Sequence, residues 1–120
     1  DLTTRWMKAV GKQKDWYLFT WYWSTFACEY QNNTEGKIYM DTMPIEGKES
    51  AIIQLGNRAN DRELLKQTLN RIGLADRISE IKEDCFINLE ETGSLDPKVV
   101  GNKLQHWIKL ISESVPSSAN

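Results

Sequence analysis

Residues 15–31, DWYLFTWYWSTFACEYQ, decide the fold of this chain. Eight of these seventeen residues are aromatic, and they include three of the chain's five tryptophans. We interpret the stretch as one β-strand, in which successive side chains point to opposite faces. One face then carries the even-numbered apolar residues Trp16, Leu18, Tyr22, Phe26, Cys28 and Tyr30.

The other face of this strand carries Tyr17, Phe19, Trp21 and Trp23. A strand with one solvated face alternates apolar with polar residues, and residues 16–23 do not. Four aromatic side chains amount to roughly 600–1,000 Å² of surface at about 150–250 Å² each. Monomeric proteins seldom expose apolar patches beyond ~300–600 Å². The sequence therefore predicts that both faces of the strand need a cover.

The composition predicts a single domain over residues 1–120. With 40% hydrophobic and 27% charged residues, it is typical of soluble globular domains. No apolar run reaches the length of a membrane-spanning helix, so we predict no membrane partner and expect a cytoplasmic protein. The acidic net charge of −2 disfavours a general nucleic-acid binder.

Residues suited to catalysis or metal binding are scarce. Cys28 and Cys85 fall in predicted strands, where we expect two buried thiols; a bridge requires that their strands be neighbours. His106 is the only histidine and no C-x-x-C occurs, so we predict no metal site and no cofactor. Neither a G-x-S-x-G motif nor a phosphate-binding glycine loop is present, so we predict no catalytic residues and favour a non-enzymatic protein.

The spacing of apolar residues predicts elements in the order α-β-β-β-α-β-α. Residues 1–14 are expected to form an arm or a short helix over 4–10, capped by Thr3 or Thr4 and ended by Gly11. After the strand at 15–31, we predict strands at 37–42, 50–55 and 85–90, helices at 61–72 and 97–115, and a flexible tail at 116–120.

This order favours an α+β fold with an antiparallel sheet of about four strands, a three-strand meander plus one. The two later helices each carry an apolar stripe, so we expect both to pack on one face of the sheet. The short N-terminal helix can cover only part of the other face. The face of Tyr17, Phe19, Trp21 and Trp23 is thus predicted to lack a full cover within the chain.

An exposed aromatic sheet face favours a protein-interaction module, which binds a protein partner or forms a homodimer. Tryptophan, tyrosine, phenylalanine and methionine are enriched at interface cores. We predict Trp21 and Trp23 as anchors, Tyr17 and Phe19 beside them, and Met40 as an adaptable neighbour. The alternative is that an internal helix covers this face completely.

A nucleic-acid-associated accessory module is the second interpretation. The same aromatic residues could stack on unpaired bases, with Lys12 and Lys14 near the phosphates. The acidic balance opposes this reading, and no glycine-aromatic-basic motif of the kind found in RNA-binding sheets is present.

A metal-dependent nuclease is a weaker form of that interpretation, because such enzymes place an Asp and a Glu-x-Lys on adjacent strands. Asp41 lies within a predicted strand. Three Glu-x-Lys tripeptides occur: Glu35-Gly36-Lys37, Glu46-Gly47-Lys48 and Glu80-Ile81-Lys82. The first two contain glycine and fall in predicted turns.

No motif identifies a family. The order of elements alone resembles that of secretion chaperones, bacterial immunity proteins and small accessory domains of restriction systems. Because a shared topology supports many functions, this resemblance implies a fold and no activity.

Overall fold

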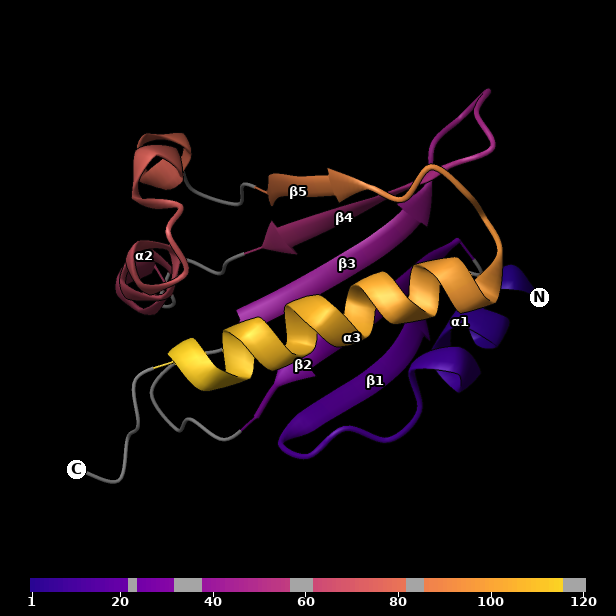
Figure 1. Cartoon of the computed structure of the whole chain (residues 1–120), viewed down its shortest axis with the longest axis horizontal. Helices are drawn as coiled ribbons and strands as arrows, with labels where there is room; N and C mark the ends of the chain where they lie inside the picture. Colours follow the sequence, from indigo (N-terminus) through magenta and orange to yellow (C-terminus); the bar gives the residue numbers. More distant parts are fainter. Residues whose placement is uncertain (22–23, 32–37, 57–61, 82–85, 116–120) are drawn as a thin grey trace.

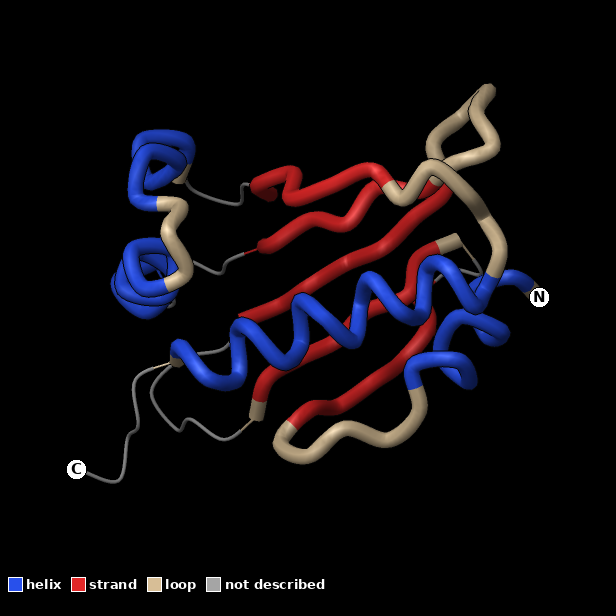
Figure 2. Tube along the Cα trace, viewed as in Figure 1, coloured by secondary structure: helices blue, strands red, loops and turns tan. Residues whose placement is uncertain are grey.

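A computed structural model of the chain describes residues 1–21, 24–31, 38–56, 62–81 and 86–115. Within these ranges, three α-helices and a short 3-10 helix accompany one antiparallel sheet, which confirms the α+β class (Figures 1 and 2). In chain order the elements are α1 (Leu2–Val10), β1 (Trp16–Trp21), β2 (Thr25–Tyr30), β3 (Ile38–Pro44), β4 (Ala51–Gly56), α2 (Arg62–Arg71), η2 (Ala75–Glu80), β5 (Phe86–Glu91) and α3 (Pro97–Ser114).

The sheet has five strands, in the order β1-β2-β3-β4-β5, and not about four. The difference arises in the aromatic stretch, which forms a hairpin of β1 and β2 instead of one strand. The amide of Ser24 donates to the carbonyl of Trp21 at 3.3 Å, where β1 ends. Even-numbered residues of β1 pair with even-numbered residues of β2, as in Trp16 with Tyr30 and Leu18 with Cys28. The predicted division of side chains between two faces therefore holds despite the turn.

The even-numbered face of this hairpin is covered by α3 (Figure 1). The indole N–H of Trp16 donates to Ser112 Oγ of α3 at 2.7 Å, and Phe26 and Cys28 are fully buried. The start of α3 is as predicted: the Asp96 side chain accepts from the Lys98 amide, and Pro97 occupies the first turn.

Helix α1 lies beside α3 on the same side of the sheet, and not on the aromatic side as expected. Trp6 of α1 is fully buried in the core, and its indole donates to the Leu95 carbonyl at 3.0 Å. The two helices approach closely at Gly101, where a Cβ atom would lie 2.8 Å from the Cβ of Ala9. The absence of a side chain at Gly101 permits this approach. The helix begins earlier than predicted, at Leu2, because Asp1 is the cap and accepts from the amide of Thr4.

Helix α2 stands at one end of the sheet (Figure 1), and not on the sheet face beside α3 as expected. Its apolar stripe contributes Leu65 and Leu69, both fully buried, to the same core. The predicted cap of this helix, Asn60, lies outside the described residues, as does the tail 116–120.

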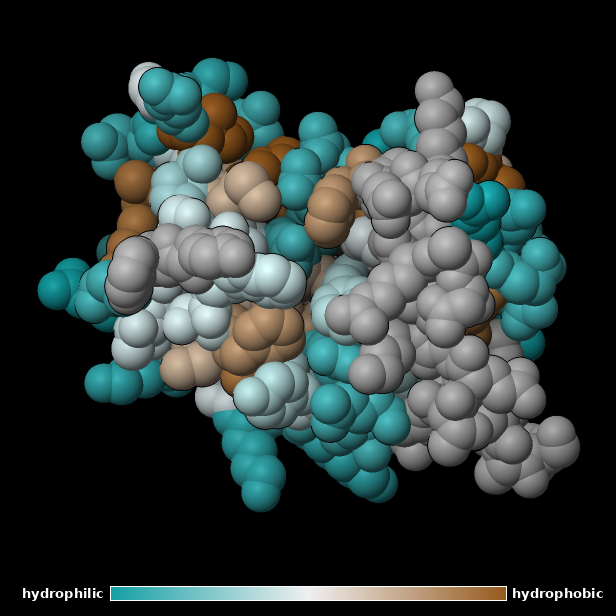
Figure 3. Space-filling model, turned by 180° about the vertical axis from the view of Figure 1, so that it is seen from behind, coloured by the Kyte–Doolittle hydropathy of each residue, from teal (hydrophilic) through white to brown (hydrophobic). Residues whose placement is uncertain are grey.

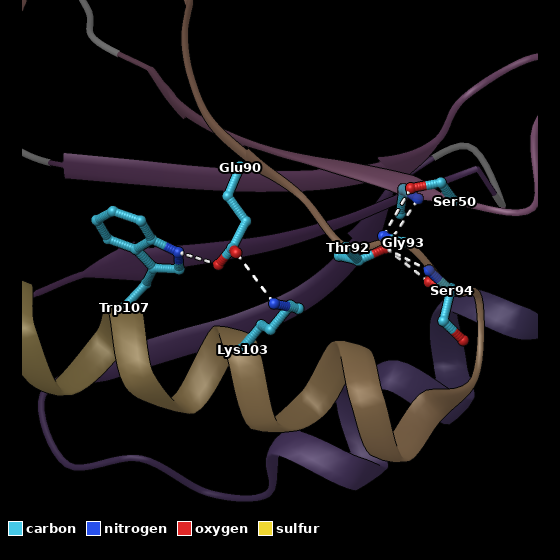
Figure 4. A network of polar contacts seen from close by, with 8 residues as sticks. Ser50, Glu90, Thr92, Gly93, Ser94, Lys103 and Trp107 are labelled. Carbon is cyan, nitrogen blue, oxygen red and sulfur yellow. Dashed lines mark hydrogen bonds and ion pairs between the residues drawn. The ribbon is translucent and has the colours of Figure 1, made fainter.

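The last strand is tied to α3 by a polar network (Figure 4). Glu90 of β5 accepts from the Trp107 indole at 2.9 Å and from Lys103 Nζ at 3.0 Å. Beyond β5, Thr92 Oγ1 accepts from the amide of Ala51 at 2.9 Å, and Ser50 Oγ accepts from the amide of Gly93 at 2.9 Å. These bonds hold the end of β5 and the entry to α3 against β4.

Candidate binding face and its acidic hollow

The side of the sheet turned away from α1 and α3 is called here the aromatic face. Two rows of residues cross this face, and each row contains one outward-pointing residue from each of the five strands. The first row is Tyr17, Glu29, Tyr39, Gly56 and Phe86; the second is Phe19, Ala27, Asp41, Gln54 and Asn88. Trp21 follows Phe19 on β1. Figure 3 views the molecule from this side.

Large hydrophobic side chains are exposed mainly on this face. In the described part of the chain they are Tyr17 at 52%, Trp21 at 46%, Phe86 at 51% and Val99 at 37% exposed. Only Val99 lies elsewhere, on α3. The rings along β1 form a ladder: those of Tyr17 and Phe19 are stacked with centroids 5.2 Å apart, and that of Trp21 follows at 6.2 Å. Three of these four exposed side chains therefore gather on one face.

The aromatic face is hollowed between its edges. The hollow has a volume of about 180 Å³. The small residue Ala27 on the inner strand β2 leaves room there, while aromatic side chains line the hollow from the edge strands β1 and β5. A Cβ atom on Gly56 would lie 2.5 Å from Cε1 of Phe86, so this ring occupies the space above the glycine. The hollow is lined by Phe19, Trp21, Ala27, Tyr39, Asp41, Gly56 and Phe86.

Among the residues that the structure describes, Asp41 is the one charged residue that lines the hollow. Within the described ranges its carboxylate forms no hydrogen bond or ion pair. Burial among apolar walls raises the pKa of Asp41 from its ordinary 3.8 to about 6. Asp41 also contributes, after burial, to raising the pKa of the Cys28 thiol on the opposite face. Cys28 is free, buried and thus unreactive, while Cys85 lies outside the described residues.

The structure brings together three of the predicted binding residues, Tyr17, Phe19 and Trp21. Trp23 lies outside the described residues. Met40 is not beside them: it is fully buried and pairs with Cys28 on the face that α3 covers. The prediction for Met40 is therefore corrected, because alternation along β3 turns Tyr39 and Asp41, and not Met40, toward the aromatic face.

The structure does not bring Lys12 and Lys14 to the hollow. Both are exposed in the connection between α1 and β1, and Lys14 lines a separate depression beside Lys109 and Ser112 of α3. The five strands contain no lysine or arginine within their described bounds. The charges that the two rows carry are those of Glu29 and Asp41, which would repel a phosphate backbone.

Within the ranges that the structure describes, no group of three or more His, Cys, Asp or Glu side chains is arranged to hold a metal ion. Glu46-Gly47-Lys48 lies in the turn between β3 and β4, and Lys37 and Lys82 fall outside those ranges. His106 is exposed on α3, with its ring centroid 6.1 Å from that of Trp107. No helix in the described part of the chain is both long and apolar enough to cross a membrane.

Five residues that line the hollow were not predicted as binding residues, and of these only Asp41 was considered at all, as a metal-holding acid: Ala27, Tyr39, Asp41, Gly56 and Phe86. The alternation of β5 held a signal, since Ile87 faces the core and Phe86 must then face away. The pairing of Gly56 with Phe86 depends on a register that the sequence does not specify.

Comparison with known proteins gives no relative: no family model, no curated protein and no solved structure matches this chain. The residues of the aromatic face are therefore the basis for a functional conclusion.

Proposed function

We propose that this chain is a non-enzymatic protein-interaction module that binds a partner protein through the aromatic face. A second copy of the chain is one form of that partner. The observation that carries the proposal is the gathering of Tyr17, Trp21 and Phe86, each about half exposed, on the side of the sheet away from α1 and α3, where Trp21 and Phe86 line a hollow.

The energetics of burial support this use of the face. Burying apolar surface contributes about 25 cal/mol per Å², and each aromatic ring offers a large area with few torsions to immobilise. The other described tryptophans belong to the core: Trp6 and Trp16 are buried, and Trp107 is partly buried against them. Trp21 is the exposed one, and we assign it the role of interface anchor.

Stacking of nucleobases is the second candidate, and the ring ladder along β1 favours it. The charges weigh against it, because acids and no bases lie on the described strands of this face. Binding of single-stranded nucleic acid normally combines stacking with a positively charged groove. Protein binding is therefore the function that the face supports best.

The test uses the full chain and three variants, Trp21→Ala, Phe86→Ala and the control Val99→Ala, which removes an exposed hydrophobic side chain outside the face. Sedimentation velocity over a range of concentrations measures self-association. A displayed peptide library then supplies binders for the wild-type protein. We expect self-association or peptide binding that Trp21→Ala and Phe86→Ala weaken and Val99→Ala does not.

Two outcomes would overturn the proposal. In the first, the wild type stays monomeric and selects no peptide that depends on Trp21 or Phe86. In the second, it binds oligothymidylate in a salt-dependent way that Trp21→Ala abolishes, which would establish the nucleic-acid function instead.

A further inference from the structure

In the part of the chain that the structure describes, the hollow combines aromatic walls with a carboxylate that has no paired cation. Asp41 is half-buried, and burial alone, with no charge or hydrogen bond, accounts for its raised pKa. A carboxylate removed from water loses hydration, and only a paired cation or hydrogen-bond donors restore that loss. In the described part of the chain neither is present at Asp41.

The walls of the hollow favour a positive charge as well. The faces of aromatic rings carry negative electrostatic potential and attract cations within about 6 Å of the ring centre. Phe19 and Trp21 stand on one edge strand and Phe86 on the other, with Asp41 on the central strand between them. A cation above Asp41 would meet a carboxylate below and aromatic side chains on both sides.

Among the cations of proteins, arginine fits this arrangement better than lysine. Its guanidinium group is planar, stacks on rings, donates two parallel hydrogen bonds to one carboxylate, and is less strongly hydrated than an ammonium group. The volume of about 180 Å³ accommodates a single long side chain.

We propose that the hollow receives an arginine side chain of the partner, with the guanidinium paired to Asp41 and flanked by the rings of Trp21 and Phe86. This inference rests on the proposed function for the existence of a protein partner, but the hollow can be tested without one. It adds to the aromatic face a specific recognition element: the partner segment carries an arginine that enters the sheet between its two edge strands.

The experiment follows amide and indole chemical shifts of the full chain while N-acetyl-arginine methylamide is added. The matched probe is N-acetyl-citrulline methylamide, which has nearly the same shape and no charge; the lysine analogue is the third probe. The variant Asp41→Asn removes the charge at constant size. The control Glu91→Gln removes a carboxylate that pairs with Lys48 at 3.7 Å and does not line the hollow.

We expect the arginine probe to shift the signals of Phe19, Trp21, Asp41 and Phe86. Citrulline should bind at least about tenfold more weakly, a difference of about 1.4 kcal/mol. Lysine should bind more weakly than arginine. Asp41→Asn should lower arginine affinity about tenfold, and Glu91→Gln should change it by less than about twofold.

Equal binding of arginine and citrulline, tighter binding of lysine, or unchanged arginine affinity in Asp41→Asn would overturn the inference. Its failure is distinguishable from failure of the proposed function. Suppose that a partner peptide needs Trp21 but binds Asp41→Asn as tightly as wild type. The arginine inference would then be wrong, and the proposal of an interaction module would stand. If the arginine probe binds in the hollow but the chain neither self-associates nor selects a peptide, the arginine site stands and the interaction module does not.

Discussion

The ring of Phe86 lies over the backbone of Gly56, its pairing partner across β4 and β5, so closely that a Cβ atom at residue 56 would come within 2.5 Å of the ring. A glycine in a strand normally weakens it, and an aromatic ring on the neighbouring strand shields the exposed backbone. Here the same contact sets one wall of the hollow, so the two residues link the stability of the sheet edge to the shape of the candidate site.

Replacing this glycine should therefore alter the hollow more than the fold. In Gly56→Ala the added methyl group displaces the exposed Phe86 ring, and we expect the free energy of unfolding to change by less than about 1 kcal/mol. Binding through the aromatic face should weaken clearly. Thermal unfolding and peptide titration measure the two effects. In a Phe86→Ala background the same change should have no further effect on binding; an undiminished effect would contradict the contact.

The crossing of α1 and α3 predicts the opposite behaviour for Gly101. Alanine is better than glycine in a helix by about 1 kcal/mol. A methyl group at residue 101, however, would lie 2.8 Å from Ala9 Cβ and 3.3 Å from the Ala9 carbonyl carbon, and backbone cannot move aside easily. We expect Gly101→Ala to lower the free energy of unfolding by about 1–2 kcal/mol in urea titrations. The exposed neighbour Asn102→Ala is the control; stabilisation by Gly101→Ala would show that the helices are not in close contact.

The titration of Asp41 makes the free energy of unfolding depend on pH, and the raised pKa fixes the direction of that dependence. Because its pKa is raised from 3.8 to about 6 on folding, the folded state holds this proton more tightly than the unfolded state. The stability that this proton binding contributes is fully present below the pKa of the unfolded state, near 3.8, and is lost as the pH rises through the folded-state pKa of about 6. Asp41→Asn should therefore be more stable than wild type at neutral pH, and the difference should shrink toward pH 4. A stability difference that does not vary with pH would contradict the burial of the carboxylate.

Glu90 should act in the opposite direction. Burial raises its pKa, but the hydrogen bonds from Trp107 and Lys103 outweigh burial and leave the pKa lowered. Its stabilising contribution is present above the unfolded value and is lost as the pH falls through the lowered one. Trp107→Phe removes one donor, and we expect a loss of about 1 kcal/mol at neutral pH, measured by urea unfolding. That loss should be smaller at pH 3, whereas the exposed residue Asn102 of the same helix is the control, and Asn102→Ala should change stability equally at both pH values.

Much of this fold could be predicted from local sequence signals. Asp96-Pro97 and the stripe that follows define α3, and Gly11, with φ of +71°, ends α1. The hairpin within residues 15–31 was not predicted, because Ser24 is the one turn-favouring residue among Tyr22, Trp23 and Ser24, and no glycine, proline or asparagine accompanies it. The aromatic residues that indicated a strand also concealed where it ended.

The candidate site was only partly predictable. Strand alternation placed Tyr17, Phe19 and Trp21 on one face, and the structure places them there. The same rule applied to β3 would have turned Asp41 outward and Met40 inward. The pairing of Gly56 with Phe86, and the absence of a cation at Asp41 in the described residues, depend on strand register and on contacts between distant segments. Those follow from tertiary packing and not from local pattern.

Mapping the contact site of a selected partner peptide tests the central claim most directly. Amide and indole chemical shifts of the full chain would be compared with and without a peptide that the wild-type protein selects from the displayed library. We predict that the largest changes fall on the aromatic face, at Phe19, Trp21, Asp41 and Phe86, and that Trp21→Ala abolishes them. Changes centred on α3 or on the connection around Lys12 and Lys14, with the aromatic face unaffected, would contradict the account.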